Sequence, residues 1–114
     1  MIPISSKKVT VIIAHRGPGN HLKDTFLDLK HWFENIVVVG LESLKFSQII
    51  KDHGGSWINN NSPHIGVLWA EGIRAHRSDW YILVQSIEYL SAVLKESIIE
   101  TINWYKDVFG DDYY

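Results

Sequence analysis

Hydrophobic residues gather in four short runs that are separated by longer segments of mixed polarity. The runs are rich in β-branched and aromatic residues and contain very few polar positions, which is typical of strands buried on both faces. They cover residues 9–14, 35–40, 56–58 and 80–84. The first run ends at His15-Arg16-Gly17-Pro18-Gly19, a segment dense in turn formers. The pattern predicts four buried strands, of which the third is the shortest.

The segments between these runs have apolar residues at three- and four-residue steps, the spacing of one helix face. We expect a helix after the capping residue Asn20, a second after Ser43, a third over 64–77 and a long amphipathic one over 88–109. Gly66 and Gly72 weaken the prediction of the third helix, because glycine costs about 1 kcal/mol in a helix interior. The remaining segments predict helices without such conflict.

Strands and helices thus alternate along the chain with short connections. This order predicts an α/β fold with a parallel sheet that is covered by helices and joined by right-handed crossovers. The chain has 114 residues, 46% of them hydrophobic, which suits one domain with its own core. In such sheets ligands bind beyond the carboxyl ends of the strands, so we expect functional residues there.

The charged residues are nearly balanced, with 11 Lys and Arg against 13 Asp and Glu and no basic cluster. This balance gives no reason to expect a nucleic acid or an anionic membrane as a partner. Cysteine is absent, which excludes disulfides and thiolate metal sites. The first apolar run is too short for a membrane span or a signal-peptide core. We therefore expect a cytoplasmic protein without a membrane span.

Several landmarks follow one another over residues 8–95. They are the first strand with the turn at 15–17, the second strand with Gly40-Leu41-Glu42-Ser43, the helix end at 49–55, the segment Trp69-Ala70-Glu71-Gly72, and the fourth strand with Gln85-Ser86-Ile87-Glu88. This order resembles the amino-terminal half of family 2 glycosyltransferases with a GT-A fold. The resemblance implies a three-layer, Rossmann-like GT-A half with a mainly parallel sheet of about four strands, as a single domain over residues 1–114.

The same resemblance identifies family residues that this chain lacks. Members carry aspartates at the end of the second strand that hold the nucleotide, where this chain has Gly40-Leu41-Glu42-Ser43 and lacks the acidic pair. Their fourth strand ends in Asp-x-Asp-Glu, and its two aspartates bind a divalent metal. Here those two positions are Gln85 and Ile87, and only Glu88 remains acidic. The acceptor half of the family would begin where this chain enters its last helix, and we expect it to be missing.

The loss of the metal ligands has a chemical consequence. Transfer of a sugar from a nucleoside diphosphate develops negative charge on the leaving group, which a carboxylate-bound metal usually stabilises. A glutamine is a weak neutral ligand and an isoleucine is no ligand. We therefore expect no cofactor and assign no catalytic residue. Mg²⁺ or Mn²⁺ enters only under the alternative that the chain is an active transferase.

The residues that follow the strands form the candidate ligand site. Gly17-Pro18-Gly19-Asn20 leads into a helix amino terminus that is suited to a phosphate, and Arg16 adds a positive charge. The alternative is an ordinary turn with a solvated arginine. For Gln85, Ser86 and Glu88 the alternative role is to close the fourth strand and to start the next helix. The candidate ligand-binding residues are His15, Arg16, Gly17, Asn20, Gly40, Glu42, Gln85, Ser86 and Glu88.

Two further features leave alternatives open. Trp69 stands where the family has a polar residue, and it either stacks on a ligand or fills the site from within. The six histidines contain no i, i+4 pair, which favours scattered surface or half-buried positions over a metal site.

The function predicted from these features is a glycosyltransferase-like, non-catalytic module that binds a nucleotide or nucleotide sugar or associates with another protein. The alternative is an active or partner-completed glycosyltransferase that takes a sugar from a nucleoside-diphosphate sugar. A third interpretation is a structural subunit. In each case the aromatic carboxyl-terminal helix suits a homo-oligomer or a partner protein. Its aromatic residues, with those of the tail, are Trp104, Tyr105, Phe109, Tyr113 and Tyr114.

Overall fold

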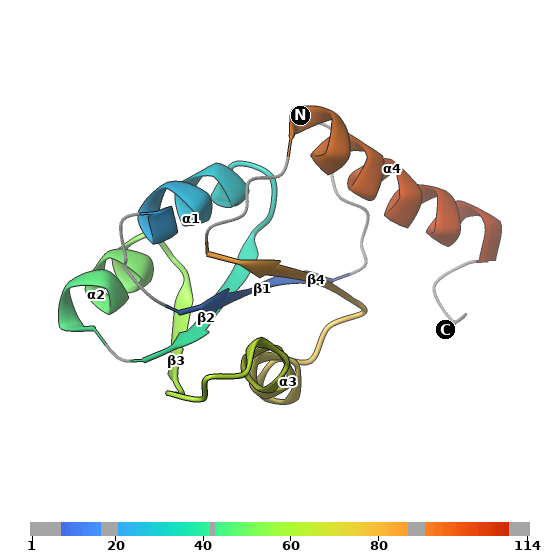
Figure 1. Ribbon diagram of the computed structural model, residues 1–114. Coiled ribbons are helices and arrows are strands. Elements are labelled where there is room, and N and C mark those ends of the chain that lie inside the picture. The colour runs from blue at the N-terminus through green and yellow to red at the C-terminus, as the bar shows by residue number, and fades with distance from the viewer. Residues whose placement is uncertain (1–7, 17–20, 42, 87–90, 110–114) are drawn as a thin grey trace.

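The computed structural model describes residues 8–16, 21–41, 43–86 and 91–109, the last four of them by their backbone only. Strands and helices alternate through this part of the chain (Figure 1). In order they are β1 (Val9–His15), α1 (Leu22–Lys30), β2 (Asn35–Gly40), α2 (Leu44–Asp52), β3 (Ser56–Asn59), α3 (Ile65–Ala75), β4 (Trp80–Gln85) and α4 (Ala92–Phe109). The predicted α/β fold is confirmed, and the predicted strands differ from these by one residue at most.

The four strands form one parallel sheet in the order β3-β2-β1-β4. β1 is paired on both sides, and all seven of its residues are buried. Its apolar composition therefore reflects two neighbouring strands and two covered faces. The register pairs His15 with Gly40 of β2 and Ala14 with Gln85 of β4. The arrangement is Rossmann-like, as predicted.

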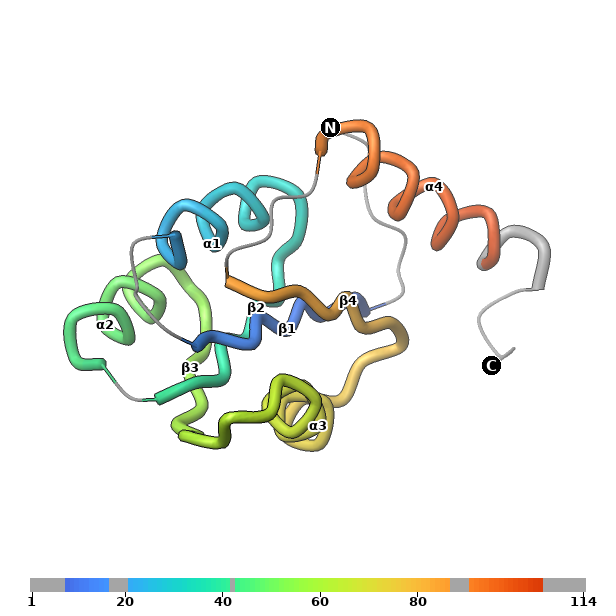
Figure 2. The backbone as a smooth tube through the Cα atoms, viewed as in Figure 1, coloured from blue at the N-terminus to red at the C-terminus, as the bar shows by residue number. Residues whose placement is uncertain are grey.

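Helices cover the two faces of the sheet unequally (Figure 2). α1, α2 and α4 pack on the face that carries Val11 and Ile13, whereas α3 packs on the opposite face against Ile12 and Ala14. Crossovers of one hand explain this division, because the chain crosses the sheet in one direction from β1 to β3 and in the other from β3 to β4. Among the described helices, α3 alone covers this second face of the sheet, which we call the α3 face.

The third helix forms in spite of its two glycines. Gly72 is buried against the sheet, and a Cβ atom there would lie 2.5 Å from Cγ2 of Ile12. Glycine at this position lets α3 approach β1 closely, and the packing gained offsets the helix cost of glycine.

The fourth helix begins at Ala92. Ser91 caps it, since its hydroxyl accepts a hydrogen bond of 3.1 Å from the N–H of Leu94. Glu88, the predicted start, lies outside the described residues. Among the helices that the structure describes, none is long and apolar enough to span a membrane.

Candidate functional site

The carboxyl ends of the parallel strands meet at one edge of the sheet, as the sequence predicts. His15 ends β1, Gly40 ends β2 beside it, and Gln85 ends β4 on the other side. The chain leaves β1 toward β2 and later returns to the opposite side of β1 as β4. The strand order therefore reverses between β1 and β4, which makes this edge the expected ligand position of the fold.

His15 lies at the centre of this edge and is only 7% exposed. Its Nδ1 atom is hydrogen-bonded to the hydroxyl of Ser86 at 3.0 Å. Its ring meets the indole of Trp57 edge-on, with ring centroids 6.0 Å apart. Burial lowers the pKa of His15 below its ordinary value of 6.5, because a charged imidazolium loses hydration there. The side chain is therefore neutral at neutral pH.

Ser86 extends this contact to a third element. Its N–H donates to the carbonyl oxygen of Ala14, which continues the pairing of β4 with β1. Its own carbonyl oxygen accepts a hydrogen bond of 2.8 Å from the hydroxyl of Thr25 on α1. His15, Ser86 and Thr25 thus form a buried polar network that joins β1, β4 and α1. Buried polar groups that are satisfied in this way fix the geometry of their surroundings.

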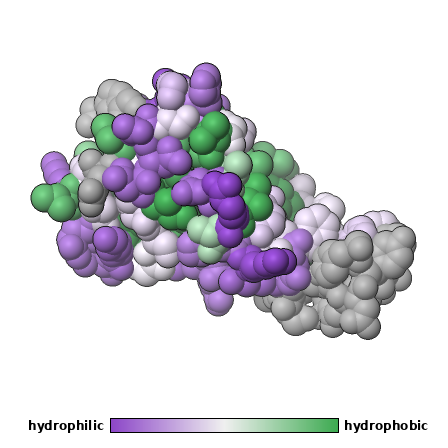
Figure 3. All heavy atoms as spheres, turned by 90° about the horizontal axis from the view of Figure 1, so that it is seen from below, coloured by the Kyte–Doolittle hydropathy of each residue, from purple (hydrophilic) through white to green (hydrophobic). Residues whose placement is uncertain are grey.

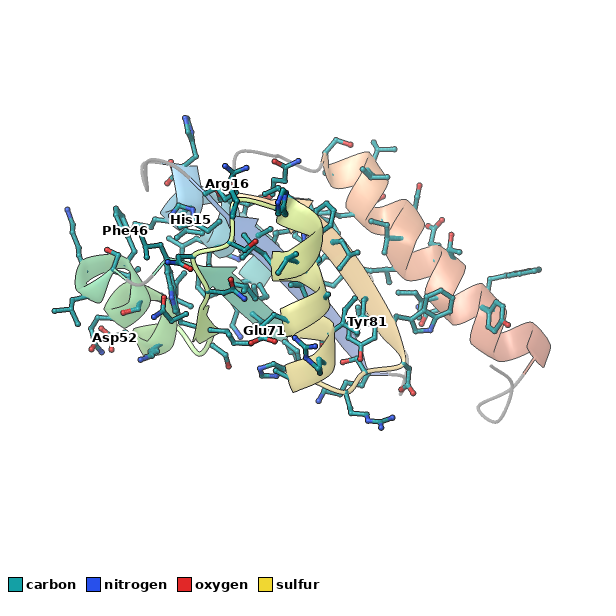
Figure 4. All side chains as sticks on the ribbon, turned by 60° about the horizontal axis from the view of Figure 1, so that its bottom comes forward. His15, Arg16, Phe46, Asp52, Glu71 and Tyr81 are labelled. Carbon is teal, nitrogen blue, oxygen red and sulfur yellow. The ribbon has the colours of Figure 1, made fainter. Side chains whose placement is uncertain are left out.

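Arg16 follows directly on β1 and is exposed (Figure 4). Figure 4 shows Arg16 next to His15. Tyr81, near the start of β4, lies toward the opposite end of the sheet. An exposed guanidinium at this edge is able to form charge-assisted hydrogen bonds to an anionic ligand.

Gly40 has a packing reason for being glycine. A Cβ atom there would lie 2.5 Å from the carbonyl oxygen and 3.0 Å from Cβ of His15. Its carbonyl oxygen accepts a hydrogen bond of 2.9 Å from the N–H of Asn60. The close approach of β1 leaves no room for a side chain at this position, and contact of Gly40 with a ligand stays a prediction.

The remaining predicted residues divide into two groups. Gln85 is the last residue of β4, and strand alternation turns its side chain to the α3 face, away from Ser86. The structure thus brings together His15, Arg16 and Ser86, with Gln85 across the sheet. Gly17, Asn20, Glu42 and Glu88 lie outside the part of the chain that the structure describes.

Trp69 belongs to the packing of the α3 face. It contacts the cluster formed by Ile12, Ala14 and Leu68, and its indole N–H donates a hydrogen bond of 3.0 Å to the carbonyl oxygen of Val84. Trp69 thus has the predicted packing role, and stacking on a ligand stays a prediction.

Within the described ranges, no group of three or more His, Cys, Asp or Glu side chains lies close enough together to hold a metal ion. At this edge the side chains of His15, Ser86 and Thr25 are buried, whereas the guanidinium of Arg16 is exposed. An exposed guanidinium suits an anionic ligand and is no ligand for a hard divalent cation.

Comparisons with known proteins do not extend this description. Neither a scan against family profiles nor searches of curated proteins and of solved structures gave a significant match.

Proposed function

We propose that this chain is a glycosyltransferase-like domain that binds a nucleoside diphosphate, or its sugar conjugate, without a metal and without transferring the sugar. The observation that carries the proposal is the exposed Arg16 at the switch point between β1 and β4, next to the buried network of His15, Ser86 and Thr25 that fixes the geometry of this edge. This place is where Rossmann-like sheets receive ligands.

The chemistry of the site fits the diphosphate of such a ligand. Arg16 supplies a fixed positive charge, and the guanidinium geometry favours paired contacts with phosphate oxygens. α1 begins at Leu22, six residues after Arg16, and the side chain of His21 at its amino end makes no capping bond. The first N–H groups of α1 are therefore suited to phosphate oxygens.

The non-catalytic part of the proposal rests on the residues at the end of β4. Gln85 and Ser86 are neutral, and no cluster of metal-ligating side chains occurs in the described residues. Without a bound cation, the charge that develops on a leaving diphosphate has Arg16 as its main stabiliser, which is less than such transfers usually require.

A thermal-shift titration with UDP, UDP-glucose, GDP-mannose and CMP-sialic acid, each with and without Mn²⁺, tests the proposal. We expect at least one of UDP, UDP-glucose and GDP-mannose, which carry a diphosphate, to stabilise the protein equally in both conditions, and the monophosphate CMP-sialic acid to have a smaller effect. A ligand at about 100 times its Kd stabilises the folded state by about 2.7 kcal/mol. For a domain of this size that corresponds to a rise in Tm of about 10 °C or more.

Arg16→Ala should abolish the shift, whereas Arg77→Ala is the matched control. Arg77 is also exposed, but it precedes β4 and so lies at the opposite end of the sheet. Stabilisation that needs Mn²⁺ would instead support the active transferase. Silence with every nucleotide would contradict ligand binding and leave the protein-interaction module.

A further inference from the structure

β4 forms one edge of the sheet, with β1 on its inner side and no described strand on its outer side. The N–H groups of Trp80 and Ser86 donate inward, to the carbonyl oxygens of Lys8 just before β1 and of Ala14 in β1. Because successive residues of a strand direct their main-chain groups to opposite sides, Tyr81 and Leu83 present N–H and C=O groups outward. Only another extended chain offers a matching row of donors and acceptors.

The sequence of β4 lacks the residues that usually prevent pairing at an edge strand. Exposed edge strands in natural proteins are commonly interrupted by proline, a bulge or a charged residue. The six residues of β4, Trp-Tyr-Ile-Leu-Val-Gln, include no proline, glycine or charge. The strand at the other edge, β3, is shorter, with four residues. β4 is therefore the edge strand that is better suited to pair with a further strand.

Apolar side chains reach the surface beside this edge. Leu83 is 41% exposed on the α3 face of β4, and Ile73 on α3 is 37% exposed. Figure 3 views this face and shows apolar areas at the surface among polar ones. The hydroxyl of Tyr81 donates to the carbonyl of His76 and accepts from the N–H of Ser78, which holds this ring toward the start of the strand. Leu83 is thus the apolar centre of the edge.

We propose that two copies of this chain pair through their β4 edges, antiparallel and around a two-fold axis at Leu83. A strand that pairs with its own copy in a closed dimer is related to it by such an axis, and the pair is antiparallel. The outward main-chain groups of Leu83 then bond those of Leu83 of the partner subunit. The two sheets become one continuous sheet.

This register explains the exposed leucine. The two Leu83 side chains lie side by side on the α3 face of the joined sheet and cover each other. A second copy satisfies the main-chain row and the apolar centre together, and the uncharged strand brings no like charges into opposition. An extended segment without an apolar residue opposite Leu83 would satisfy the main-chain row alone.

The first test is the molar mass of the 114-residue chain by light scattering over a concentration series. We expect a dimer at high concentration, and Leu83→Lys should shift the protein to a monomer with an unchanged circular dichroism spectrum. Leu44→Lys is the matched control, because Leu44 is 82% exposed on α2, which packs beside β3 at the other side of the sheet. This variant should remain dimeric.

A cysteine cross-link tests the register itself, since the natural chain has no cysteine. Residues that face each other in a hydrogen-bonded antiparallel pair have Cα atoms about 5.5 Å apart, within the range of a disulfide. Under mild oxidation, Leu83→Cys should give a covalent dimer, and Leu44→Cys should give none. A chain that is monomeric at every concentration, or a dimer that Leu83→Lys leaves intact, would overturn the proposal.

Discussion

At the scale of single residues, the candidate site depends on a histidine that is held inside the protein. His15 contacts Ser86 and Trp57, and its pKa is lowered because burial disfavours the imidazolium. In the unfolded chain the same histidine is hydrated and protonates near its ordinary value of 6.5. The folded state therefore binds fewer protons at this residue than the unfolded state does, and its stability depends on pH.

His15 should make the protein less stable in mild acid. Since the folded pKa lies below the unfolded one, the contribution of neutral His15 is complete above about pH 6.5 and is lost as the pH falls through the folded pKa. Urea unfolding at a series of pH values from about 8 to about 5 measures this loss. His15→Asn should lower stability overall and flatten the pH dependence. An equally steep dependence in this variant would assign the effect to other groups.

At the scale of elements, the sequence predicts the bounds of a strand or helix best where they depend on the segment's own residues and not on contacts with residues far away in the sequence. β2 has the predicted bounds because its residues are apolar on both faces. The strand ends gather as expected because parallel strands share one carboxyl edge. Thr25 was missed, since its bond to Ser86 joins residues 61 positions apart and no local pattern signals it. The reason for Gly72 is likewise a contact, with Ile12 of another element.

The two glycines of α3 should respond oppositely to alanine. Gly72→Ala should destabilise the protein by about 1–3 kcal/mol, because the added methyl group collides with the buried Ile12. Gly66→Ala has no heavy atom within 4 Å of its new Cβ and should stabilise by up to about 1 kcal/mol through helix propensity. Chemical denaturation of both variants measures these changes. Equal effects at the two positions would contradict close packing of α3 on β1.

At the scale of the whole molecule, the last helix is joined to the first by a buried charge. Lys95 of α4 has a side chain only 4% exposed, and its Nζ atom donates to Asp28 of α1 at 2.7 Å. The same ammonium lies 5.1 Å from the ring centroid of Trp32. Around this pair, Ile99 and Ile102 of α4 enter the core between the helices and the sheet. A lysine inside an otherwise apolar helix face thus sets how α4 lies against α1.

Substitution of Asp28 and substitution of Lys95 should therefore change the free energy of unfolding by different amounts. Asp28→Asn leaves the buried ammonium without its counter-charge and should destabilise by about 1–3 kcal/mol, limited by the partial exposure of Asp28. Lys95→Met keeps the aliphatic volume, removes the buried charge, and should change stability by less than about 1 kcal/mol. The double variant should recover most of the loss caused by Asp28→Asn, since no buried charge remains. Urea unfolding of the four proteins forms a double-mutant cycle, and a large loss in Lys95→Met would mean that the ion pair stabilises the packing of α4 by more than its desolvation costs.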